Sequence, residues 1–183
     1  MRKMLHDIPD EMKAYPQWVA MYFSYESLTG KIIAKARDFD NPSPRNKQWN
    51  TRFANKEVGF KNQGYIRVRL PNNKCLYAHQ IAFLLMTGSI PEEIDHRDLN
   101  RTNNVWKNLR DCTHSENAAN CFKRITNKSG FKGVCWNKSN KAWQMNIQFQ
   151  HKTYFGYFST KEGAYAAYCL KSAELHKEFG NVE

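Results

Sequence analysis

The side chains between Trp143 and Gln150 alternate strictly between apolar and amide types, and this alternation constrains the fold more than any other feature of the sequence. Because successive side chains of a strand point to opposite faces, the pattern predicts a strand with one buried and one solvated face. The whole segment 131–158 is strand-like, and Ser159-Thr160-Lys161-Glu162 has the form of a capping box, which opens a helix that stops near Gly180. The sequence therefore predicts a three-stranded antiparallel sheet with one helix on its apolar face. The apolar side chains of the alternation are Trp143, Met145, Ile147 and Phe149, and the amides are Gln144, Asn146, Gln148 and Gln150.

Shorter signals predict the elements that precede this sheet. Apolar runs on both sides of Leu28-Thr29-Gly30 predict a hairpin over 22–35. Residues 38–63 are polar and rich in Asn, Pro, Arg and Lys, which predicts a long loop, either a DNA-facing arm or a solvated connector. Alternation in 64–70 predicts a strand that a turn leads back into 75–77.

Two helices are expected between residues 78 and 125. The first has apolar residues at helical spacing from Ala78 to Leu85 and ends at Gly88. The second begins at the capping box Thr113-His114-Ser115-Glu116. We expect its apolar face to contain Ala118, Cys121, Phe122 and Ile125.

The charge balance points to a polyanionic partner. The chain has 28 Lys and Arg against 17 Asp and Glu, a formal net charge of +11. A hydrophobic content of 41% argues against wholesale disorder, and no apolar run approaches the roughly 20 residues that span a bilayer. The N-terminus has no secretory signal, so we expect a cytoplasmic protein. Five scattered cysteines predict free thiols, with neither a disulfide framework nor a zinc site.

Four residues form a candidate catalytic set: Asp95, His96, Asn108 and Asn117. Hydrolysis of a phosphodiester needs a base for water and a cation for the charge that develops on the leaving oxygen. A neutral His96 can accept a proton near pH 7. The oxygens of Asp95 and Asn117 are hard ligands that suit Mg²⁺.

The motifs around this set closely resemble the HNH homing endonucleases of phages, from about Gly64 to Asn120. The resemblance implies a ββα-metal fold in which His96 is the general base, Asp95 and Asn117 bind Mg²⁺ or Mn²⁺, and Asn108 braces the loop that bears the histidine. It also implies products with 5′-phosphate and 3′-hydroxyl ends. The family usually has Gly where this chain has Leu99. The matching motifs are Tyr77-Ala78-His79-Gln80-Ile81-Ala82, Ile94-Asp95-His96-Arg97-Asp98-Leu99-Asn100-Arg101-Thr102-Asn103-Asn104, Asn108-Leu109-Arg110 and Thr113-His114-Ser115-Glu116-Asn117.

The C-terminal segment, about 127–183, looks like the Apetala/ethylene-response-factor DNA-binding domain. The resemblance rests on Ser129-Gly130-Phe131-Lys132-Gly133-Val134, on Lys141-Ala142-Trp143, and on the run from Phe155 to Tyr168. In that family the solvent face of a three-stranded sheet enters the major groove. By matching position, the resemblance implies DNA contacts from Lys132, from Asn137 or Lys138, and from Asn146, Gln148, Lys152 and Tyr154.

These observations predict an α+β protein with three parts: a basic N-terminal region at 1–63, a nuclease core at 64–125, and a DNA-binding domain at 126–183. The predicted function is metal-dependent cleavage of double-stranded DNA, with the C-terminal domain selecting the site. A homodimer would allow both strands to be cut. The alternatives are a DNA-binding regulator with an inactive nuclease core and a structural RNA-binding protein.

Overall fold

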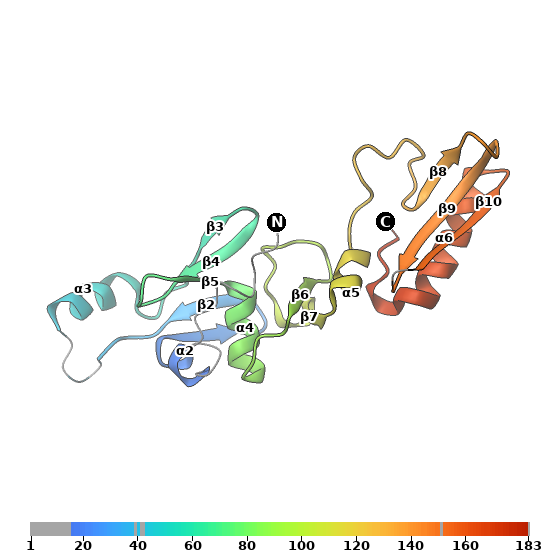
Figure 1. The fold of residues 1–183 in the computed structure, drawn as a ribbon. Helices are drawn as coiled ribbons and strands as arrows, with labels where there is room; N and C mark the ends of the chain where they lie inside the picture. The colour runs from blue at the N-terminus through green and yellow to red at the C-terminus, as the bar shows by residue number, and fades with distance from the viewer. Residues whose placement is uncertain (1–15, 39, 41–42, 151, 183) are drawn as a thin grey trace. The chain divides into compact units, whose positions relative to one another are not determined.

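The structure is a computed structural model that describes residues 16–38, 40, 43–150 and 152–182. The chain divides into two compact units, Met1–Asp111 and Cys112–Glu183, each of which is described by itself (Figure 1). Part of the predicted N-terminal basic region, residues 1–15, lies outside the described residues.

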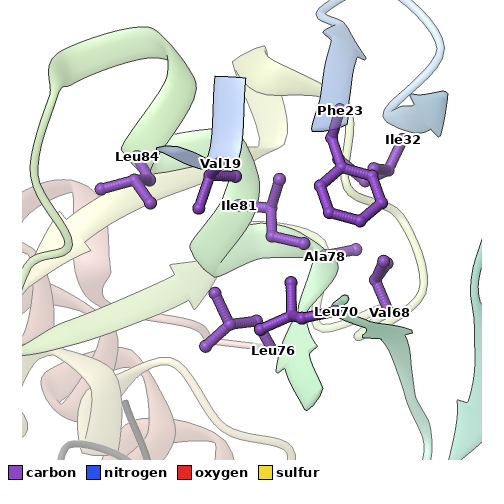
Figure 2. Close-up of a cluster of buried hydrophobic side chains, with 9 residues drawn as sticks. All are labelled: Val19, Phe23, Ile32, Val68, Leu70, Leu76, Ala78, Ile81 and Leu84. Atoms are coloured by element: carbon purple, nitrogen blue, oxygen red, sulfur yellow. The ribbon is translucent and has the colours of Figure 1, made fainter. Parts of the chain in front are cut away.

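The first unit has one main hydrophobic core, formed where α4 packs on the hairpin β1–β2 and on the sheet β3–β4–β5. Figure 2 shows the nine buried side chains of this core, contributed by α2, both hairpin strands, β4, Leu70 directly after β4, β5 and α4. As predicted, α4 ends at Gly88, which has a φ of 81°. The elements of this unit are α2 (Pro16–Tyr22), β1 (Phe23–Glu26), β2 (Lys31–Ala34), α3 (Pro44–Phe53), β3 (Phe60–Asn62), β4 (Tyr65–Arg69), β5 (Cys75–Tyr77), α4 (Ala78–Thr87), β6 (Glu93–His96), the 3-10 turn η1 (Trp106–Asn108) and β7 (Leu109–Cys112).

The turn of the β1–β2 hairpin rests against the backbone that follows β6. The Tyr25 hydroxyl donates to the Asn104 carbonyl at 2.7 Å, and the Trp106 amide donates to the Ser27 carbonyl at 3.0 Å. Gly30 has a φ of 75°, and a Cβ there would lie 2.5 Å from the carbonyl carbon of Asn104. Only glycine fits at this contact, so the hairpin confirmed here also positions the loop after His96.

Residues 38–63 do not form the predicted long loop. They contain helix α3 and strand β3. Ser43 caps α3 by accepting a hydrogen bond from the Asn46 amide at 3.3 Å, and Pro44 occupies its first turn. A Ser-Pro pair is a helix start signal, and the richness of this segment in Asn and Pro concealed it.

Strands β6 and β7 pair with each other, and the capped helix α5 (His114–Ala119) follows. The predicted capping box is present: Thr113 accepts from the Glu116 amide, and the Glu116 carboxylate accepts from the Thr113 amide. The helix is shorter than predicted, because Phe122 is 63% exposed and Ile125 is fully exposed beyond its end. The prediction of an apolar helix face that extends to Ile125 is therefore wrong.

The second unit contains the predicted three-stranded sheet with one packed helix. The antiparallel strand order is β10–β9–β8, and the helix covers Val134, Met145 and Ile147. Thr160 caps the helix by accepting from the Gly163 amide, so the third helical residue is a glycine, and the expected capping box through Glu162 does not form. The elements are β8 (Val134–Asn137), β9 (Ala142–Phe149), β10 (Lys152–Phe158), α6 (Lys161–His176) and the 3-10 turn η2 (Lys177–Phe179).

Within the described parts of the chain, no helix is both long and apolar enough to cross a bilayer. All five cysteines carry free thiols.

Candidate active site and nucleic-acid interface

Asp95 and His96 end strand β6, and both side chains are buried. The Asp95 carboxylate forms an ion pair with Arg110 on the paired strand β7. The Nε and Nη2 atoms of Arg110 lie 2.8 and 2.7 Å from Asp95 Oδ2. Charged hydrogen bonds from a planar guanidinium fix the orientation of a carboxylate. Arg110 is thus a positioning partner of Asp95, a role that sequence reasoning did not identify.

His96 is held by an amide in the loop that follows it. Its Nε2 lies 3.2 Å from Asn104 Oδ1, and Asn104 Nδ2 donates to the Thr102 carbonyl at 3.3 Å. An amide oxygen only accepts, so this orientation makes Nε2 the protonated ring nitrogen and Nδ1 the basic one. Burial lowers the pKa of His96, although the hydrogen bond that His96 donates to Asn104 opposes the shift. The imidazole is therefore neutral at pH 7.

Aromatic rings enclose His96 on one side. The His79 ring meets it edge-on at 5.2 Å and stacks on Tyr77 at 5.2 Å, while Tyr65 lies 6.3 Å from His96. Full burial lowers the pKa of His79 to about 3. His79 is consequently a neutral packing residue that keeps water from one side of the candidate base.

Asn108 joins the two ends of the loop after His96. Its Oδ1 accepts from the Asp98 amide at 3.0 Å, and its Nδ2 donates to Asp98 Oδ1 at 2.9 Å and to the Asn103 carbonyl at 2.7 Å. This geometry is what a bracing residue requires. Leu99 adopts a φ of 59° in the same loop, so the turn keeps the left-handed backbone that glycine favours.

Asn117 lies on α5 in the second unit, and its role as a metal ligand remains a prediction. Among the described residues, no three His, Cys, Asp or Glu side chains gather into a metal-binding cluster. The oxygen donors predicted for the metal site are the carboxylate of Asp95 and the side-chain amide of Asn117.

The outer face of the β8–β10 sheet is lined by amides and aromatic rings. Asn137 donates to Gln144, which donates to Asn146, each at 2.7 Å. Opposite this ladder on β10 stand Phe155 and Tyr157, paired with Asn146 and Gln144 and exposed by 60% and 44%. Directly paired residues share a sheet face, so the two rings and the amides form one surface. These exposed aromatic residues were missed, although their alternation with Tyr154 and Phe158 could have indicated them.

Three predicted DNA contacts lie elsewhere. The Lys132 ammonium donates to the carbonyls of Ala119, Cys121 and Asn181 at 2.7 to 2.8 Å, which uses all three of its donors inside the unit. Tyr154 pairs with Ile147 and packs against the core beneath α6, and Lys152 pairs with Phe149. Register therefore puts Tyr154 and Lys152 on the opposite side from Asn146 and Gln148. None of these three residues therefore lies on the outer sheet face, and their predicted placement there is wrong.

Asn146 and Gln148 also line a groove of about 1080 Å³ within the second unit. Its other wall is the segment after α5, which brings Lys123, Arg124 and Lys128 to the groove. No Asp or Glu occurs among the described residues that line it. Lys138 is exposed in the turn between β8 and β9. The groove thus combines amides with positive charge, the residue types that contact DNA bases and phosphates.

Comparison with known proteins found similarities for the segment around His96. Residues 76–119 match the family described as HNH endonuclease. Protein 3.8 of Escherichia phage T7 is 36% identical over 67 residues, which are 36% of this chain and 55% of the phage protein. The chain therefore aligns with about half the length of that curated relative, and no solved structure matches. Residues 76–119, which contain Asp95, His96, Asn108 and Asn117, are thus similar to the HNH endonuclease family.

Proposed function

We propose that this protein is a metal-dependent HNH endonuclease of the phage homing type, which hydrolyses duplex DNA to 5′-phosphate and 3′-hydroxyl ends. The observation that carries the proposal is the environment of His96. This histidine is buried, neutral and oriented by Asn104, and it lies inside the segment that matches the HNH family. A general base needs such a fixed, unprotonated imidazole.

His96 acts on water in this proposal. With Nε2 bound to Asn104, Nδ1 takes the proton as the water oxygen attacks phosphorus, and the hydrogen bond at Nε2 stabilises the imidazolium that results. As the new phosphorus–oxygen bond forms, the phosphorus–O3′ bond breaks, and the 3′ oxygen leaves and takes up a proton to become the 3′-hydroxyl end. Asn108 maintains the loop geometry on which this alignment depends. The rings of His79 and Tyr77 exclude solvent from one side.

The donor chemistry at this site fits a divalent cation. Asp95 offers a carboxylate held by two hydrogen bonds from Arg110, and metal-binding carboxylates are commonly oriented by such partners. Asn117 would supply an amide oxygen, and Mg²⁺ or Mn²⁺ favours both donor types. When bound, the cation would neutralise charge on the scissile phosphate and the leaving oxygen.

Selection of the cleavage site is assigned to an Apetala/ethylene-response-factor-type domain at 126–183. Its supporting features are the outer sheet face with Asn146 and Gln148, the exposed Lys138, and the cations of the adjoining groove. Residues 126–183 carry 8 Lys and Arg against 4 Asp and Glu, a net charge of +4. A homodimer of this chain would bring one nuclease domain to each strand.

Plasmid cleavage tests the catalytic assignment. His96→Ala should lose about 10²- to 10⁴-fold in cleavage rate with DNA binding retained, because general-base catalysis contributes about that factor. Lys161→Gln, on the helix side of the second unit, is the control and should cut at the wild-type rate. Unchanged cleavage by His96→Ala would remove His96 from the mechanism, and cleavage that persists in EDTA would contradict metal dependence.

One observation favours a second candidate, a DNA-binding regulator that does not cut. The Asp95 carboxylate is buried and already engaged by Arg110, a geometry that also suits a purely structural ion pair. Binding of duplex DNA without cleavage across Mg²⁺ and Mn²⁺ titrations would establish this alternative.

A further inference from the structure

Helix α3 contributes nothing to a hydrophobic core. None of its ten residues is buried, and its six exposed positions include Arg45 and Lys47. A helix with no buried residue gains little from packing, which is the usual source of helix stability in proteins. Figure 1 shows α3 standing clear of the other helices and sheets of its unit.

The chain leaves β2 to build α3 and returns to the same strand. The Asn55 amide donates to the Ala34 carbonyl at 2.7 Å, and the Ala34 amide donates to the Lys56 carbonyl at 3.0 Å. The segment between Ala34 and Asn55 therefore begins and ends at the same place, where these two hydrogen bonds join its ends at β2. Its removal would leave the core of the first unit unchanged.

Specific contacts hold α3 in one orientation despite its exposure. The Arg37 amide donates to Asn50 Oδ1 and the Arg37 carbonyl accepts from Asn50 Nδ2, each at 2.8 Å. The Arg37 guanidinium lies over the Trp49 ring at 3.8 Å and near Tyr22 at 5.7 Å. The hydrogen bonds and the contact with Trp49 thus hold α3 against Arg37, and the contact of Arg37 with Tyr22 connects this segment to the rest of the unit.

The charge of α3 indicates which class of partner the helix would bind. From Ser43 to Lys56 the chain carries four cations and no carboxylate. Arg45, Gln48 and Arg52 are all exposed, and their spacing of three and four residues places them on one face of the helix. Arginine and glutamine bind phosphates and base edges in the major groove of DNA, which admits an α-helix.

We infer that α3 is a second DNA-binding element, which docks on duplex DNA through the face that carries Arg45, Gln48 and Arg52, with the exposed Lys47 adjacent to this face. The inference rests on the proposed function only in taking duplex DNA as the partner. It gives the protein two separate DNA contacts, one from a helix of the first unit and one from the sheet of the second.

Salt dependence of binding by the full chain provides the test. Binding of a fluorescent 40-base-pair duplex is measured in EDTA, so that the result does not depend on cleavage. Each phosphate contact contributes about 0.9 to the log–log salt slope, so Arg45→Gln/Arg52→Gln should lower the slope by about 1.8 and weaken binding about tenfold or more at 0.1 M salt. Arg45→Lys/Arg52→Lys should retain most of the slope, since the charges remain.

The matched control variant removes two positive charges from α6 in the second unit instead of from α3. Lys161→Gln/Lys171→Gln neutralises two lysines on α6 and should leave the slope within experimental error of wild type. An equal loss in both double variants would attribute the effect to net charge alone and overturn the inference. Unchanged binding by Arg45→Gln/Arg52→Gln would overturn it as well, and so would stronger competition by duplex RNA than by duplex DNA.

A measurement on the unmodified protein covers the case in which the glutamine variant does not fold. Bound duplex should protect Lys47 from acetylation, read by mass spectrometry, while Lys171 reacts at the same rate with and without DNA. Equal reactivity of Lys47 in both states would refute docking by α3. Failure of the wild-type chain to bind duplex DNA at all would instead refute the proposed function.

Discussion

Asp95, His96 and Asn104 are each at most 5% exposed, whereas Phe155 and Tyr157 on the sheet of the second unit are 60% and 44% exposed. The first group is held by hydrogen bonds and an ion pair within residues 95–110, and the second is presented by a sheet whose core lies on the other side. The proposed base must be fixed and kept neutral, while the proposed recognition surface must be accessible. Under the proposed function, we therefore expect substitutions at the first site to change stability and chemistry together, and substitutions at the second to change binding alone.

The largest expected effect on stability comes from the ion pair at the buried site. Arg110→Met leaves the Asp95 carboxylate buried without its cation and should lower the free energy of unfolding by about 3–5 kcal/mol. Urea denaturation measures the loss. The double variant Asp95→Leu/Arg110→Met, which has no uncompensated charge, should be more stable than Arg110→Met alone. A single variant within 1 kcal/mol of wild type would show that the pair is not buried in solution.

The next largest effect is expected in the pH dependence of stability, which the buried His79 beside the first site should alter. His79 has its pKa lowered to about 3 by burial, against an ordinary value near 6.5. Between these values the unfolded chain binds a proton that the folded chain does not, so stability falls as the pH decreases from 6.5 toward 3, by at most about 1.4 kcal/mol per pH unit. In His79→Gln this contribution should be absent. Parallel pH profiles for the two proteins would contradict the burial of His79.

Substitutions on the outer face of the β8–β10 sheet should change DNA binding without a change in stability. Asn146→Ala should reduce the discrimination between cognate and unrelated duplexes by about 1–3 kcal/mol, the range for one base-reading side chain. Its melting temperature should stay close to that of wild type. Tyr154→Phe, on the opposite side of the sheet, should leave affinity and sequence preference unchanged. Loss of affinity in Tyr154→Phe, with none in Asn146→Ala, would reverse the assignment of the DNA-binding face.

The smallest effect is expected at Leu99. Its φ of 59° strains an L residue, and Leu99→Gly should raise the free energy of unfolding by about 1 kcal/mol, less the contribution of its half-buried side chain. Thermal and urea denaturation measure this difference. A clear destabilisation would mean that the packing of Leu99 outweighs its backbone strain.

Local signals predicted most elements, because capping and alternation act within a few residues. The box at Thr113, the end of α4 at Gly88 and the alternation of β9 are all of this kind. Helix α3 also had a local signal in Ser43 and Pro44, but the polar composition of its surroundings masked it.

Errors at the candidate sites came from contacts that are distant in sequence or depend on register. Lys132 binds carbonyls from residues 119, 121 and 181, a set that no short motif reveals. The side on which Tyr154 lies follows from its pairing with Ile147. Asn104 was one of two adjacent asparagines, and only the structure shows which of them reaches His96.

The close approach of Gly30 to Asn104 makes the segment that matches the HNH family dependent on a turn 74 residues earlier in the chain. A side chain at position 30 would displace the backbone of Asn104, the residue whose side-chain amide contacts His96. A random screen for inactive variants should therefore recover substitutions at Gly30, far from the reacting atoms. For the same reason, transplanting residues 76–119 into another scaffold would carry over the base but not the hairpin that sets its orientation.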